Sequence, residues 1–285
     1  MLKSLKEQVW AFDCEWAPDP QAGRLLHDLP GETPDRQAME VMWLHGGATP
    51  ENPTPFLKMV VCRVLSIAAV CRRKIGNEDT RLDLLWLPRD TSDIRQCSEQ
   101  NVINTFLQAI GKHRPQLVGF NSKNADLKIL VQRAVINGLS VPEFCKRPEK
   151  PWDGNDYFAR DSDVHLDLME IVSGYGEKRG VSLNEIATLS GIPGKFGIRG
   201  DQVAELWLNG QIEKIVNYNC CDAISTYLLW LRMAHLTGIF TRDQYADEQD
   251  LVREMLMNLA EKPEMAFLEN YFEEWERLLH ATGQQ

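Results

Sequence analysis

An apolar segment near the start of the chain runs directly into two acidic residues. Residues 9–12 (VWAF) favour a β-strand, and Asp13 and Glu15 follow with a single residue between them. Because side chains alternate between the two faces of a strand, both carboxylates are predicted to lie on the same face. Like charges that lie close together repel, so a buried pair requires a cation between them or raised pKa values. The pattern predicts a metal site, with an acidic pair on the protein surface as the alternative.

The middle of the chain contains a strand, a turn and a helix around a third acidic residue. Residues 117–118 are predicted to form a short buried strand, residues 121–122 a turn, and residues 125–137 a helix that Gly138 ends. Asp126 then lies in the first turn of this helix. An acidic residue at that place stabilises a helix by about 0.3–1 kcal/mol through the helix dipole. A structural role is therefore the alternative to metal binding for Asp126.

The fourth acidic residue lies in a long segment with helical periodicity. Apolar residues recur at helical spacings over residues 212–231, and Gly238 is predicted to end the helix. Tyr218 and Asp222 are separated by three residues, so a phenol and a carboxylate are predicted on one face of this helix, about one turn apart. For this spacing alone, a hydrogen-bonded pair on the surface is the alternative.

The order of these motifs resembles that of a known group of enzymes. The succession D-x-E, N-x4-D and Y-x3-D is similar to that of the DEDD superfamily of 3′-5′ exonucleases, whose fold is RNase H-like. The matching residues are Asp13, Glu15, Asn121, Asp126, Tyr218 and Asp222. The sister group of this superfamily carries a histidine about five residues before the last aspartate, where this chain has Asn217. The resemblance therefore favours the tyrosine subclass.

Residues 8–238 resemble, more narrowly, the predicted 3′-5′ exonucleases related to the proofreading domain of family B DNA polymerases. Three segments support this resemblance: VGFN at 118–121, VHLDLMEIVSGYG at 164–176 and SLNEIATLSGIPGKFGIRGDQV at 182–203. The chain departs from the family at Ala125, where an aromatic residue is usual. This departure concerns the packing around the second motif and leaves its acidic residue in place.

The resemblance implies a role for each residue of the motifs. Two Mg²⁺ or Mn²⁺ ions are expected, with Asp13 bridging both of them. Glu15 and Asp222 are expected to complete the site of the ion that activates water, while Asp126 supports the second ion. Tyr218 is expected to orient the nucleophilic water. The implied reaction removes nucleoside 5′-monophosphates from the 3′ end of single-stranded nucleic acid, with DNA preferred. An exoribonuclease in RNA maturation or decay, or a catalytically silent nucleic-acid-binding module, is the alternative.

Candidate substrate-binding residues lie close to these motifs. They are Asn121, Lys123, His165, Lys195, Phe196 and Arg199. Glycines surround Lys195, Phe196 and Arg199, so the backbone is expected to approach a phosphate while the phenyl ring stacks on a base. A solvated connection between two helices is the alternative for this segment. The formal net charge of −10 argues against strong nonspecific binding to duplexes.

A further acidic group competes for the metal. This group consists of Asp161, Asp163 and Asp167. Asp163, His165 and Asp167 alternate with apolar residues, which places these three on one face of a predicted strand. We interpret this strand as a sheet edge or as part of the substrate side of the site. For His165 the alternative is a buried structural histidine.

The whole pattern predicts an α/β protein with an RNase H-like mixed sheet flanked by helices. Residues 60–70 and 82–87 are predicted as a hairpin beside the first strand. The predicted exonuclease domain is 1–238, with an irregular insertion at 17–55 that carries many prolines and glycines. Residues 239–285 are predicted to form a helical extension packed on the core, with a partner-binding tail as the alternative. Its predicted packing face comprises Met255, Leu259, Phe267, Tyr271, Trp275 and Leu278.

Composition restricts the setting in which the protein works. The chain has no apolar stretch near the roughly 18 residues that span a bilayer, and its polar start does not match a secretory signal. Its seven cysteines have no spacing typical of zinc, which favours reduced thiols in the cytoplasm. The expected partner is the 3′ end of a single strand, in DNA repair or in proofreading together with a separate polymerase. A protein partner bound through the C-terminal extension is a further expectation.

Overall fold

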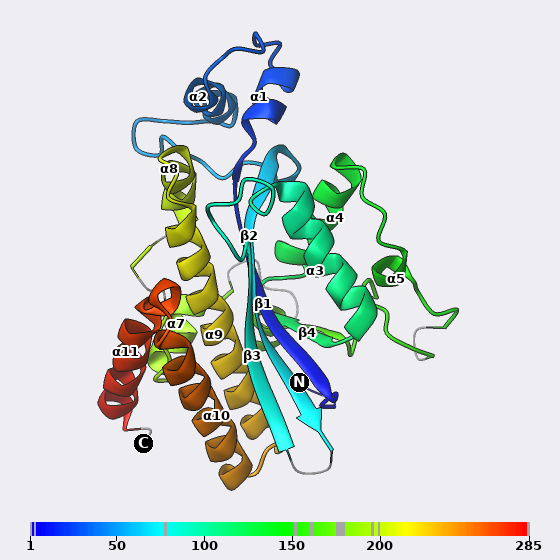
Figure 1. Ribbon diagram of the computed structural model, residues 1–285, viewed down its shortest axis with the longest axis vertical. Coiled ribbons are helices and arrows are strands. Elements are labelled where there is room, and N and C mark those ends of the chain that lie inside the picture. The colour runs from blue at the N-terminus through cyan, green and yellow to red at the C-terminus, as the bar shows by residue number, and fades with distance from the viewer. Residues whose placement is uncertain are drawn as a thin grey trace.

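A five-stranded mixed sheet forms the centre of the protein (Figure 1). The computed structural model describes residues 2, 4–76, 79–150, 153–159, 162–174, 180–194, 197–198 and 200–283. The strands are β1 (Gln8–Pro18), β2 (Cys62–Ile75), β3 (Asp79–Leu87), β4 (Gln116–Gly119) and β5 (His165–Asp167), in the order β3-β2-β1-β4-β5. β1, β2 and β3 pair antiparallel, whereas β4 and β5 run parallel to β1. The predicted hairpin, the mixed sheet and the RNase H-like class are confirmed.

Helices cover both faces of the sheet and follow its last strand. They are α1 (Pro20–Leu26), α2 (Asp35–His45), α3 (Glu99–His113), α4 (Asp126–Ile136), α5 (Pro142–Cys145), α6 (Leu168–Val172), α7 (Leu183–Leu189), α8 (Val203–Leu208), α9 (Ile212–Leu236), α10 (Arg242–Ala260) and α11 (Phe267–Thr282). Short 3₁₀ turns occupy Met59–Val61, Gly200–Gln202 and Pro263–Met265. Ser98 accepts a hydrogen bond from the Asn101 N–H at the start of α3, and Ser182 forms a capping box with Glu185 at the start of α7.

The alternation of side chains along β1 divides the core into two layers. Val9 and Ala11 are buried against α9, whereas Trp10 and Phe12 are buried against α3 and α4. Figure 1 shows the sheet between these helices, with α10 and α11 outside α9. Asp13 and Glu15 continue the series that begins with Val9 and Ala11, so their carboxylates face α9 at the end of the strand.

The segment between β1 and β2, residues 19–61, is called the insertion below. It was predicted to be irregular over 17–55, and this is wrong in part because β1 continues to Pro18 and two helices follow. α1 begins where the Asp19 carboxylate accepts a hydrogen bond from the Gln21 N–H and Pro20 occupies the first turn. α2 buries Ala38, Met39 and Met42, which supply the apolar face that a helix needs. The prolines and glycines cluster in the connections rather than throughout.

The C-terminal helices α10 and α11 pack on α9. Tyr271 and Trp275 are fully buried, and the Tyr271 hydroxyl lies 2.8 Å from the hydroxyl of Ser225 on α9. A buried ion pair between Arg72 of β2 and Glu248 of α10 adds a polar contact. The predicted packing face is confirmed, while the expected protein partner stays a prediction. Within the part of the chain that the structure describes, no helix is long and apolar enough to cross a membrane.

Candidate active site

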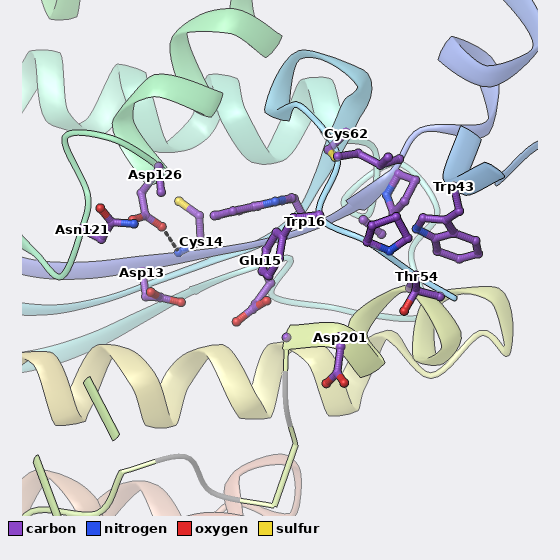
Figure 2. A pocket seen from close by; sticks show the side chains of 18 of the residues that line it. Asp13, Cys14, Glu15, Trp16, Trp43, Thr54, Cys62, Asn121, Asp126 and Asp201 are labelled. Carbon is purple, nitrogen blue, oxygen red and sulfur yellow. Dashed lines mark hydrogen bonds between the residues drawn. The ribbon is translucent and has the colours of Figure 1, made fainter. Parts of the chain in front are cut away.

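Three carboxylates meet where β1 passes over α9. Asp13, Glu15 and Asp222 each offer a ligand atom within 4.8 Å of the others; these three residues are called the acidic site. Figure 2 shows Asp13 and Glu15 on the same side of β1, which confirms the face predicted from their spacing. Glu15 and Asp222 are buried, so the surface acidic pair that was the alternative is wrong. The site joins residues that are more than two hundred positions apart in the sequence.

Electrostatic repulsion within the acidic site favours a bound cation. Burial raises the pKa of Asp13 well above its usual range, and the carboxylates of Asp126, Asp222 and Glu15 raise it further. Burial also raises the pKa of Asp126 to about 7, although a hydrogen bond from the Cys14 N–H opposes the shift. A divalent cation relieves such repulsion, and carboxylate oxygens are the ligands that hard ions such as Mg²⁺ and Mn²⁺ prefer. The residues present therefore fit a divalent metal.

Asp126 lies beside the acidic site, at the start of α4. Its Oδ1 accepts a hydrogen bond of 3.0 Å from the backbone N–H of Cys14, so it is tied to β1 between Asp13 and Glu15. The turn before it needs two unusual backbone positions. Asn121 has φ of 64°, and a Cβ at Gly119 would lie 2.3 Å from Cβ of Ser122. The N-x4-D spacing thus places a carboxylate against β1, in addition to its favourable position at the helix start.

Tyr218 lies one helical turn before Asp222. Its side chain is only 4% exposed and packs with Met39 of α2 and Leu65 of β2, so the surface pair that was its alternative is wrong. Burial raises the pKa of Tyr218, and the charges of Asp222, Glu15 and Asp13 raise it further, together with a hydrogen bond to Asp222. The phenol therefore stays protonated at neutral pH and acts as a hydrogen-bond donor beside the acidic site.

The predicted substrate-binding residues have different environments. Asn121 lines the same cleft as Asp13 and Glu15. Lys123 is engaged within the protein, because its Nζ lies 2.7 Å from Oε2 of Glu170. His165 is 1% exposed and its Nε2 lies 2.9 Å from the Ser122 hydroxyl, so the predicted substrate contact is wrong and the structural alternative is right. Lys195, Phe196 and Arg199 lie outside the described residues.

Asp167 of the competing acidic group has a structural role. Its carboxylate accepts hydrogen bonds from the backbone N–H groups of Asn121 and Lys123, and it caps α6 through Met169 and Glu170. β5 is an edge strand, as interpreted from the sequence. Asp161 lies outside the described residues. The pattern D-x-x-E at the start of α6 could have identified Asp167 as a cap, and the sequence analysis missed it.

The cleft continues from the acidic site toward the insertion. Its walls include Trp16, Trp43, Phe56 and Phe120, and Ala125 lies at the position where an aromatic residue was expected. In Figure 2, Asp126 and Asn121 lie at one end of the pocket and Trp43 and Thr54 at the other, with Glu15 and Trp16 between them. Sequence analysis did not identify these aromatic residues, because the signal for the insertion was its content of proline and glycine.

The sheet, its helices and the acidic site define an RNase H-like α/β protein with a candidate metal centre. A comparison with known protein families matches residues 54–275, more than half of the chain, to the family described as predicted 3′-5′ exonuclease related to the exonuclease domain of PolB. The chain belongs to this family, as the motifs predicted. The match includes Asn121, Asp126, Tyr218 and Asp222 but begins after Asp13 and Glu15, which the fold brings to Asp222. A search of curated proteins found no match.

Proposed function

We propose that this protein is a 3′-5′ exonuclease that depends on two divalent metal ions and shortens single-stranded nucleic acid, preferably DNA. The observation that carries the proposal is the convergence of Asp13, Glu15 and Asp222, whose ligand atoms lie within 4.8 Å of one another. Two of these residues, Asp13 and Glu15, also line a cleft. Membership of a family of predicted exonucleases supports the direction and class of the reaction. Three hard oxygen ligands with mutual repulsion support the use of Mg²⁺ or Mn²⁺.

The acidic site and Asp126 would hold the ions. When bound, two such ions activate water, neutralise the phosphoryl group and stabilise the leaving oxygen. The charges of Asp126, Asp222 and Glu15 all raise the pKa of Asp13, so Asp13 is close enough to all three that it would help to hold the ions. Asp126 is fixed by the Cys14 N–H and supports the second position.

Tyr218 would position the attacking water. Because its phenol keeps its proton, Tyr218 would donate a hydrogen bond to the water oxygen once Asp222, its hydrogen-bond partner in the structure, binds an ion, and would direct a lone pair toward phosphorus. The oxygen of the water bonds to phosphorus as the bond between phosphorus and the 3′ oxygen of the preceding nucleotide breaks. The attacking water gives up one proton and the departing 3′ oxygen takes up one, so the products are a nucleoside 5′-monophosphate and a strand that ends in a 3′-hydroxyl.

Single strands are favoured because the acidic site is recessed. Glu15 is 9% exposed and Asp222 is 8% exposed, so a terminal nucleotide must enter the cleft to bring its phosphate to these carboxylates. A base that is paired in a duplex has to leave its partner first, which costs unpairing and stacking energy. The same five residues would also serve for hydrolysis of RNA, so the test compares the two polymers directly.

The test compares DNA and RNA single strands of one sequence, labelled at the 5′ end, in Mg²⁺, Mn²⁺ or a chelator. We expect a ladder of products that shorten one nucleotide at a time, release of nucleoside 5′-monophosphates, and no products with the chelator. A strand with a blocked 3′ end is the control and is expected to resist hydrolysis. Internal cleavage, release from the 5′ end or full activity in the chelator would each contradict the proposal.

A further inference from the structure

One cleft is lined by Asp13 and Glu15 of the acidic site and by a group of aromatic residues that no metal chemistry requires. Trp16, Trp43 and Phe56 line the same cleft as Asp13 and Glu15; these three residues are called the aromatic wall. Trp16 follows Glu15 directly along β1 after a shift in the pairing with β2. Figure 2 shows Trp16 next to Glu15 along β1 and Trp43 farther from the carboxylates. The aromatic wall and two residues of the acidic site, Asp13 and Glu15, therefore line one cleft.

The aromatic wall is accessible to a ligand. Phe56 is 93% exposed, although burying a phenyl ring is favourable, and it belongs to a connection rather than to a helix or strand. Trp16 and Trp43 are half-buried. Trp16 and Trp43 each pack partly against a core cluster and also line the cleft, whereas Phe56 lines the cleft without belonging to any core cluster. A single exposed apolar residue is ordinary on a protein surface, but three aromatic side chains around one cleft are typical of a ligand site. They present ring surfaces to whatever occupies the cleft.

The insertion that carries Trp43 and Phe56 is fixed to the rest of the protein. Met39 of α2 is fully buried in a cluster with Val203 and Tyr218. Arg36 of α2 also forms two hydrogen bonds, of 2.9 and 2.8 Å, with the carboxylate of Glu205 on α8. The aromatic wall therefore has a defined position relative to Tyr218 and the acidic site.

The chain between Trp43 and Phe56 is held against α2 as well. A Cβ at Gly46 would lie 2.4 Å from Cδ2 of Leu57, so the segment that follows the helix folds back tightly at this glycine. The Thr49 and Asn52 backbones close the intervening turn through hydrogen bonds of 3.0 and 3.1 Å. These contacts bring the residue before Leu57, Phe56, to the same cleft as Trp43.

We propose that the aromatic wall binds nucleobases at the 3′ end of the substrate strand by stacking, while the phosphate lies at the acidic site; this inference rests on the proposed function. A nucleotide has an anionic and a flat aromatic part, and the cleft offers a metal-binding end and an aromatic end. Stacking on aromatic side chains tolerates every base, because each base has a π-face. Stacking on the aromatic wall thus binds the strand without clustered basic residues, which suits a chain whose formal net charge is −10.

The test uses two strands that differ only at the 3′-terminal nucleotide, which carries a base in one and is abasic in the other. We expect the wild-type protein to bind the strand with the base about tenfold more tightly, measured with Ca²⁺ in place of Mg²⁺, and to hydrolyse it with a correspondingly higher kcat/KM. Phe56→Ala and Trp43→Ala are expected to reduce this ratio to about two or less. Phe56→Trp is expected to retain it.

Leu44→Ala is the matched control. Leu44 is the neighbour of Trp43 on α2, is 68% exposed, and does not line the cleft. It is expected to keep the full ratio. Trp43→Ala removes a half-buried side chain and is checked by thermal melting, whereas Phe56 is so exposed that its loss leaves the packing intact.

The outcomes separate the two proposals. A ratio that stays near tenfold in both the Phe56→Ala and Trp43→Ala variants, or a wild-type ratio near one, overturns the stacking inference and leaves the exonuclease standing. Absence of hydrolysis by the wild-type protein, with a binding ratio that depends on Phe56 and Trp43, overturns the proposed function and leaves the aromatic wall as a base-binding site.

Discussion

Two groups of acidic residues, one around Arg133 and the other the acidic site, differ in what balances their charge. The first group consists of Arg133, Glu99 and Asp19 and is called the arginine cluster. Arg133 of α4 donates two hydrogen bonds to Glu99, of 2.7 and 2.6 Å, and one of 2.7 Å to Asp19. In the acidic site, the neighbours that raise the pKa of Asp13, after burial itself, are carboxylates. The guanidinium of Arg133 supplies the positive charge in the first group, whereas the second group could hold a metal cation.

The two groups contain the same types of acidic residue and differ in their partners, which are an arginine in the first group and other carboxylates in the second. The arginine cluster ties the end of β1, through Asp19, to α3 and α4, and Glu99 also accepts the Val64 N–H of β2 at 2.7 Å. It thus holds together the elements that carry Asp13, Glu15 and Asp126. Removing a charge is expected to damage stability in one group and chemistry in the other.

The largest expected effect is the loss of hydrolysis when a carboxylate of the acidic site is removed. Asp222→Asn and Asp13→Asn are each expected to lower kcat by roughly 10³-fold or more, because metal ions contribute several kcal/mol of transition-state stabilisation. The melting temperature in a chelator is expected not to fall, since the change relieves repulsion. Asp250→Asn, at a largely exposed acid of α10, is the control. Full activity of the Asp222 variant would overturn the catalytic assignment.

The opposite result is expected in the arginine cluster. Arg133→Met leaves two buried carboxylates without their shared cation, and breaking such a group costs about 3–5 kcal/mol of unfolding free energy. Urea denaturation followed by circular dichroism measures this loss. A change below about 1 kcal/mol would show that the cluster is not needed to hold the strand and helices together.

Removing the hydroxyl of Tyr218 is expected to act on chemistry alone. Tyr218→Phe keeps the packing against Met39 and Leu65 and is expected to lower kcat by about 10²-fold, with little change in KM. Steady-state kinetics together with a melting curve separate the two effects. A variant that loses stability and keeps its rate would reassign Tyr218 to the core.

Stability is expected to depend on metal and pH together. The raised pKa of Asp126, about 7, means that the folded state holds protons more tightly than the unfolded state. This contribution is complete below about pH 4 and is lost as the pH rises through about 7. Mg²⁺ competes with those protons, so it is expected to raise Tm more at about pH 8 than at about pH 5. An equal increase at both values, or an undiminished one in Asp222→Asn, would contradict a metal at this site.

The smallest effect is expected at an exposed ion pair. Arg36 and Glu205 are 50% and 56% exposed, and solvent screens the attraction between such groups. Arg36→Ala is expected to leave the urea midpoint unchanged within error, in contrast to Arg133→Met. A loss as large as that of Arg133→Met would mean that burial does not distinguish the two arginines.

The sequence by itself determined the features that depend on local backbone geometry. The alternation of β1 placed Asp13 and Glu15 on one face, and helical periodicity placed Tyr218 one turn from Asp222. Ser98 and Ser182 marked helix starts because their hydroxyls satisfy nearby backbone N–H groups. Each of these relations spans only a few residues, so the repeat of a strand or helix fixes it wherever the element lies.

Only the tertiary structure decided which of these local features meet. Asp222 reaches β1 because both faces of the sheet must be covered, and α9 covers the face that Asp13 and Glu15 share. The same packing buried His165, paired Lys123 with Glu170, and brought Trp43 and Phe56 of the insertion to the cleft. Such contacts join distant segments, and their energy comes from burial and charge neutralisation over the whole molecule, which no short stretch of sequence contains.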